Sequence, residues 1–161
     1  MPNRVFRIEY HAFYNCTSLT NMVIPSSVSS IVDFAFERCT NLAAAYFQGN
    51  APADSGNQFL NDPIATVYYL PGSTCWGLTF GSAPAVLWNP QAKSPGFQAG
   101  DFGFAITGPK NATIVVEACA NLSAPIWLPV ATNTLDAVGV SAFSDAETSR
   151  YSSRFYRFRS P

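Results

Sequence analysis

A 23-residue repeat at the start of the chain constrains the fold more than any other feature of the sequence. When residues 5–27 are aligned with residues 28–50, apolar and small residues coincide in the same columns. The matched pairs are Val5/Val28, Ile8/Ile31, Ala12/Ala35, Phe13/Phe36, Cys16/Cys39 and Leu19/Leu42. A fixed period of roughly 20–30 residues is typical of a solenoid, in which each coil buries its apolar face against its neighbours. The repeat therefore predicts a stack of coils.

Each repeat contains a short segment with the alternation of a β-strand. In the first repeat, Met22 and Ile24 share one face of this segment, and Pro25 ends it because proline lacks a backbone donor. The period continues less clearly into a third coil, where Phe59 aligns with Phe36 and Tyr69 with Tyr46. A shorter interval then leads to residues 85–88, which we predict to be a fourth strand.

The phrase I-x-x-x-A-F-x-x-C-x-x-L-x-x-[apolar]-x-I-P-x-x-V, from Ile8 to Val28, resembles the BspA-like class of leucine-rich repeats. The resemblance is closest over residues 5–50 and extends through residues 51–88. It implies a right-handed solenoid with a parallel β-sheet. It also implies a bacterial cell-surface or secreted protein, since members of this class are mostly associated with adhesion and with host or matrix binding.

The second half of the chain has a different pattern. Residues 89–100 break the period and are rich in Pro, Gly and small polar residues, which indicates a linker. Residues 101–161 contain short alternating segments, which predict a small antiparallel β-sandwich with Trp127, Val130, Val140 and Phe143 among its core residues. The motifs Phe102-Gly-Phe and Arg154-Phe-Tyr-Arg157 resemble a fibronectin-III-like or immunoglobulin-like C-terminal module of bacterial extracellular proteins.

Composition agrees with a mainly β chain: only 12% of the 161 residues are charged, and 12 are proline. The sequence contains no run of 18 or more apolar residues, so it gives no prediction of a membrane-spanning helix. The net charge of −1 gives no reason to expect nucleic acid as a partner. We expect three segments: a solenoid of three to four coils over residues 1–88, a linker over 89–100 and a β-sandwich over 101–161.

Residues with catalytic or metal-binding potential are few. The one histidine, His11, belongs to no recognisable triad, and a turn or packing role is expected for it. Cys16 and Cys39 share a column, so they could form a disulfide between neighbouring coils or pack as small apolar side chains. Asp145 and Glu147 offer too few oxygens for an ordinary calcium loop. We predict no enzyme, no cofactor and no metal site.

Tyr46, Tyr68 and Tyr69 lie on successive predicted solenoid strands. Alternation turns some of them outward, where an aromatic strip could contact a ligand. They could instead cover the junction between the two halves, an interpretation that we favour for Trp88.

We therefore expect a non-enzymatic, adhesion-type interaction module at the surface of a bacterium or outside it, with an unidentified protein or glycan as its partner. Two alternatives remain open: a carbohydrate-binding unit that uses the tyrosines, and a structural cap or spacer without a ligand. Residues 1–13 lack the layout of a signal peptide, so we expect any leader to lie upstream. We also expect self-association through the open face of the first repeat.

Overall fold

The structure, a computed structural model, describes residues 4–53 and 56–161. The chain divides into two compact units, Met1–Trp88 (unit 1) and Asn89–Pro161 (unit 2). Both units are built from strands, which confirms the predicted mainly β class. Among the described residues, no helix is long and apolar enough to cross a membrane.

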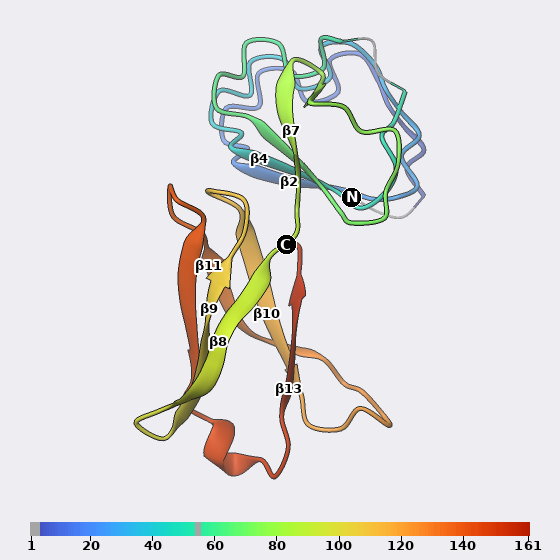
Figure 1. Cartoon of the computed structure of the whole chain (residues 1–161). Helices are drawn as coiled ribbons and strands as arrows, with labels where there is room; N and C mark the ends of the chain where they lie inside the picture. Colours follow the sequence, from blue (N-terminus) through green and yellow to red (C-terminus); the bar gives the residue numbers. More distant parts are fainter. Residues whose placement is uncertain (1–3, 54–55) are drawn as a thin grey trace. The chain divides into compact units, whose positions relative to one another are not determined.

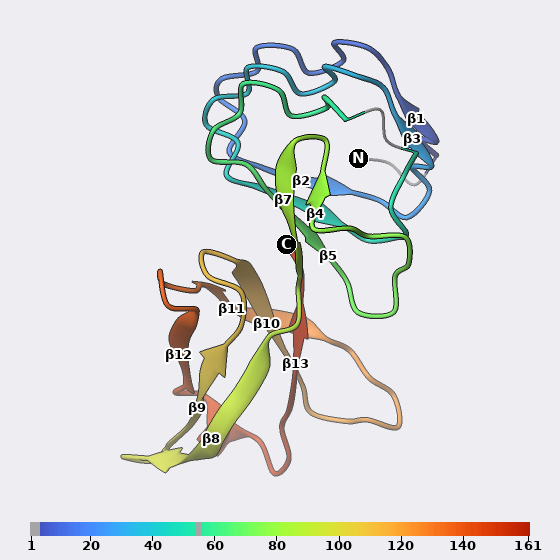
Figure 2. The same ribbon diagram turned by 45° about the horizontal axis from the view of Figure 1, so that its top comes forward.

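In unit 1 the chain winds into a solenoid of about four turns over residues 7–87 (Figure 1). One side of the coils carries a sheet of order β2-β4-β5-β7-β6, in which the first four strands are parallel. The five strands of this sheet are β2 (Asn21–Ile24), β4 (Ala44–Phe47), β5 (Thr66–Tyr69), β7 (Ala83–Leu87) and β6 (Thr79–Phe80). On another side, β1 (Arg7–Ile8) pairs in parallel with β3 (Ser30–Ile31), as Figure 2 shows.

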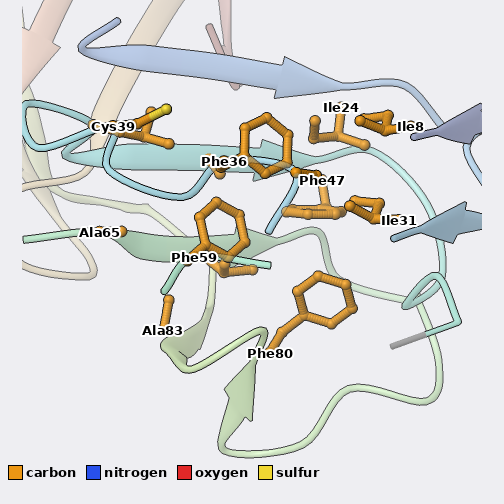
Figure 3. Close-up of a cluster of buried hydrophobic side chains, with 14 of the residues drawn as sticks. Ile8, Ile24, Ile31, Phe36, Cys39, Phe47, Phe59, Ala65, Phe80 and Ala83 are labelled. Carbon is orange, nitrogen blue, oxygen red and sulfur yellow. The ribbon is translucent and has the colours of Figure 1, made fainter. Parts of the chain in front are cut away.

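The interior of the solenoid consists of columns of like side chains, one from each coil (Figure 3). Phe13, Phe36 and Phe59 stack with ring centroids 5.2 and 5.0 Å apart and nearly parallel planes. The backbone hydrogen bonds follow the same period, because the amides of these three residues donate to the carbonyl oxygens of Ala35, Gln58 and Gly81 at 2.8–2.9 Å.

The repeat columns lie where the sequence predicts them. The members from the second coil are buried, namely Ile31, Ala35, Phe36, Cys39 and Leu42, as is Ile8 from the first coil. In the first coil, Phe13, Cys16 and Leu19 are only partly buried and Ala12 is exposed. Each later coil is thus packed on both sides, whereas the first is packed on one side only.

The solenoid ends in a hairpin, in which β6 runs antiparallel to β7. Gly81 at its turn has φ +60°, and an added Cβ would lie 2.7 Å from the Gln58 side chain. Glycine therefore lets the hairpin approach the third coil closely enough to accept the hydrogen bond from Phe59.

The strand register differs by one residue from the predicted one. Tyr46 pairs with Tyr68, not with Tyr69, because the third coil is one residue shorter just before β5. A shift by one residue moves each side chain to the other face of a sheet. Tyr69 accordingly lies in register with Phe47, on the core side, where it stacks on Trp76 with ring centroids 5.0 Å apart.

Unit 2 consists of two three-stranded antiparallel sheets, of order β12-β9-β8 and β11-β10-β13. Phe104 of the first sheet contacts Tyr156 and Phe158 of the second at 5.9 and 5.8 Å between ring centroids, so the sheets face each other. The elements are β8 (Gln91–Gln98), β9 (Asp101–Thr107), β10 (Thr113–Cys119), β11 (Leu128–Thr134), β12 (Val140–Asp145), the 3-10 helix η1 (Thr148–Arg150) and β13 (Phe155–Arg159).

Two expectations for this half need correction. Residues 89–100 are not a linker throughout, because residues 91–98 form β8 and pair with β9. β8 is an edge strand with mostly exposed side chains and a bulge between Lys93 and Gly96, so it has neither the alternation nor the composition of a buried strand. Val130 and Val140 are 37% and 40% exposed, whereas Phe143 lies in the core as expected.

Candidate functional site

The three tyrosines proposed from the sequence lie on neighbouring strands, but they do not form an exposed strip. Tyr46 and Tyr68 stack with centroids 5.1 Å apart and are 1% and 3% exposed. Burial, together with the nearby Tyr46, raises the pKa of Tyr68 to about 12, against the opposing effect of a hydrogen bond with Thr66. Tyr69 remains partly exposed to solvent, but its ring packs on Trp76.

An exposed group of rings lies elsewhere, on the turns of the first two coils. The ring of His11 stacks on Tyr10 with centroids 3.9 Å apart and lies 4.5 Å from Tyr14. Phe34 from the second coil meets Tyr10 edge-on at 5.7 Å. Tyr10 and Tyr14 are 56% and 39% exposed, so the rings are open to solvent while they contact one another.

Two charged residues of the second coil border these rings. Arg38 donates from Nη1 to the Tyr14 hydroxyl at 3.1 Å, and its guanidinium lies 5.9 Å from the centre of that ring. Glu37 lies 3.5 Å from Nε2 of His11 and 3.8 Å from Nε of Arg38. We call the six residues Tyr10, His11, Tyr14, Phe34, Glu37 and Arg38 the aromatic ledge.

The turn backbone positions the ledge. His11 and Phe34 occupy equivalent positions in successive coils and have φ of 57° and 60°, a left-handed conformation that bulky residues adopt rarely. The same conformation recurs at Asn15, Arg38 and Asn61, so these turns are a property of the repeat. The turns are held by backbone hydrogen bonds between coils, so the solenoid itself fixes the backbone that carries these rings.

The chemistry of the ledge is that of a contact surface. Rings with exposed faces, a guanidinium and a carboxylate can stack on a partner and hydrogen-bond to it. His11 has the turn position that its sequence context predicts, and its polar neighbour is Glu37. Among residues 4–53 and 56–161, no three His, Cys, Asp or Glu side chains are grouped so as to hold a metal ion.

Sequence reasoning missed the ledge because residue type changes within its columns: His11 is aligned with Phe34, and Tyr14 with Glu37. Tyr10 and Tyr14 flank His11 only in the first coil, and the second coil supplies Phe34 and Arg38. The available signal was the density of rings in the segment Tyr-His-Ala-Phe-Tyr over residues 10–14, next to a predicted turn.

The coils, their columns and their closing hairpin define unit 1 as a β-solenoid of a repeat protein. The family model described as BspA type leucine rich repeat region matches residues 1–73, in six copies. Residues 1–73 are therefore similar to a BspA-type leucine-rich-repeat region, which is found in a family of bacterial surface repeat proteins. No curated protein and no solved structure matches the chain.

The family match does not extend into unit 2. The strands of this unit form the expected antiparallel sheets. Its assignment to a fibronectin-III-like or immunoglobulin-like module stays a prediction from the sequence.

Proposed function

We propose that the chain is a non-catalytic interaction module of a protein displayed on a bacterial surface or secreted, and that unit 1 binds a protein partner through the aromatic ledge. Unit 2 serves in this proposal as a spacer or cap. The repeat family supports the location, since its members are bacterial surface proteins. The ledge supports the mode of binding.

The observation that carries the proposal is the exposure of several rings that are already ordered by one another. Tyrosine and arginine are, with tryptophan, enriched among the energetically dominant contacts of protein interfaces. Tyr14 is held by Arg38 before a partner arrives, so little side-chain entropy remains to be lost on binding. A structural spacer without a ligand has no use for an exposed ring, whereas Tyr10 is 56% exposed where it contacts Phe34.

The test is binding of the whole chain to immobilised extracellular-matrix proteins, measured by biolayer interferometry. We expect saturable binding to at least one of them, and we expect Tyr10→Ala combined with Tyr14→Ala to weaken it by roughly tenfold or more. Leu78→Ala is the matched control, because Leu78 is an apolar residue of the same unit and is 92% exposed.

Two outcomes would contradict the proposal. Saturable binding that the double variant does not change would move the binding site away from the ledge. Absence of binding to every matrix protein would favour the alternative of a structural spacer without a ligand of its own.

A further inference from the structure

Unit 2 contains a cleft of about 460 Å³ at the end of the sandwich where β8 turns into β9. The hairpin contributes Phe97 and Phe102, and the segment from η1 to β13 contributes the opposite wall. A volume of this size is sufficient for a small molecule or for one residue of a larger ligand. All of its lining residues belong to unit 2, so the cleft is complete within this unit.

Aromatic rings form much of the wall. Phe102 stacks on Tyr156 with centroids 5.3 Å apart, and Phe97 meets Phe102 edge-on at 5.4 Å. Phe97 and Tyr151 are 69% and 41% exposed, so both rings present surface to solvent at the cleft. Exposed rings on two sides of a cleft offer flat apolar surfaces to a ligand that enters between them.

A buried ion pair adjoins these rings. The Arg154 side chain is 8% exposed, and its Nε lies 2.6 Å from Oδ2 of Asp145, which also accepts a hydrogen bond from the Tyr156 hydroxyl at 3.0 Å. The guanidinium lies 4.1 Å from the centre of the Tyr151 ring. Arg154, which lines the cleft, is therefore held in one position by a carboxylate and a ring.

The charges at the cleft balance. Asp145 neutralises Arg154, and the neighbouring Arg150 is paired with Glu147 at 2.8 Å. The rest of the rim carries the hydroxyl groups of exposed Ser149, Ser152 and Ser153, which can both donate and accept hydrogen bonds. An anion would find no excess positive charge here, whereas a neutral ligand rich in hydroxyl groups would find complementary partners.

From this arrangement we propose that the cleft binds one neutral sugar residue of a glycan. The sugar ring packs between Tyr151 and Phe97, and its hydroxyl groups hydrogen-bond to the serines and to Arg154. This site is separate from the aromatic ledge, since every residue of the cleft lies in unit 2 and every residue of the ledge lies in unit 1. The two sites can therefore be disabled independently.

The experiment is saturation-transfer-difference NMR of the whole chain with the methyl glycosides of glucose, galactose, mannose and N-acetylglucosamine, and with glucuronic acid as the charged counterpart. We expect saturation transfer to at least one neutral glycoside. Phe97→Ala and Tyr151→Leu should each weaken binding by roughly threefold to tenfold, the loss expected for one aromatic contact. Both residues are exposed, so these variants should remain folded.

Val138→Ala is the matched control, because Val138 is an 81% exposed apolar residue of the same unit near the opposite end of β9. Three results would overturn the proposal: no saturation transfer to any neutral glycoside, signals in the Tyr151 and Phe97 variants that equal those of the wild-type chain, or binding of glucuronic acid alone. Arg154→Lys separates binding from folding. If this variant melts at the wild-type temperature, the chain is still folded. It should nevertheless lose sugar binding, because lysine cannot replace the hydrogen bonds that depend on the planar guanidinium.

Discussion

The carboxyl group of Asp62 is buried beside the Cys39 thiol, in the column that cysteines occupy in the first two coils. Asp62 follows Cys39 by 23 residues, as Cys39 follows Cys16. Asp62 is only 9% exposed, and neither of its carboxylate oxygens has a well-formed hydrogen bond among the described residues. Burial raises its pKa to about 6, although the Cys39 backbone amide opposes this effect.

This pKa makes the stability of the solenoid depend on pH. Because the pKa of Asp62 is higher in the folded chain than its ordinary value of 3.8, protonation favours folding. The resulting stabilisation is complete below about pH 4 and is lost as the pH rises through about 6. We expect urea unfolding to give a free energy at pH 4.5 that exceeds the value at pH 7.5 by about 1–2 kcal/mol from this group.

Asp62→Asn separates this contribution from those of other groups, since the amide cannot titrate. The pH dependence of the variant should be smaller than that of the wild-type chain by the amount assigned to Asp62. Equal pH dependence in the two proteins would show that the carboxyl group is not perturbed by burial.

The cysteines provide a second test. All four are free in the structure, so a thiol titration under denaturing conditions should find four thiols. In the native chain, exposed Cys75 should react first with a thiol reagent. Burial, together with the nearby Asp62 and Cys16, raises the pKa of the Cys39 thiol to about 11, although a hydrogen bond with the backbone of Cys16 lowers it. Cys39 should therefore react last. Fewer than four thiols after denaturation would restore the disulfide between Cys16 and Cys39.

Phe36 is the central ring of its column and is 0% exposed. Removing it in Phe36→Ala leaves a cavity between Phe13 and Phe59 and should lower the free energy of unfolding by about 3–5 kcal/mol. Leu78→Ala should change it by no more than about 0.5 kcal/mol, because Leu78 is 92% exposed. Similar unfolding midpoints for the two variants would mean that the phenylalanine column does not carry the core.

The open face of the first coil supports a prediction about association. Phe13, Cys16, Leu19 and Met22 pack on the second coil and are only partly buried. We propose that this face packs against the same face of a second copy of the 161-residue chain, and we expect molecular mass to rise with concentration in light scattering. Leu19→Lys should shift the chain toward monomer, whereas Leu78→Lys should not. A wild-type chain that stays monomeric at high concentration would contradict this prediction.

The repeat made much of unit 1 predictable. In a solenoid each coil packs mainly on its neighbours, so a column in the alignment becomes a column in space. For this reason Phe13, Phe36 and Phe59 could be assigned to one stack before any coordinates existed. In unit 2, Phe143 lies in the core as its place in an alternating segment predicts, because opposite faces of a strand have different surroundings.

By itself the sequence determined the coiled architecture, the core columns and the division into a repeat half and a sheet half. Only the tertiary structure decided the position of Tyr69, because one missing residue before β5 changes the face of a side chain without disturbing the apolar composition. It also decided that residues 91–98 form a strand, since an exposed edge strand is held by backbone pairing that leaves little trace in residue type. The tertiary structure likewise decided the aromatic ledge and the cleft of unit 2, because each brings together residues from separate turns or strands whose proximity depends on how the chain packs.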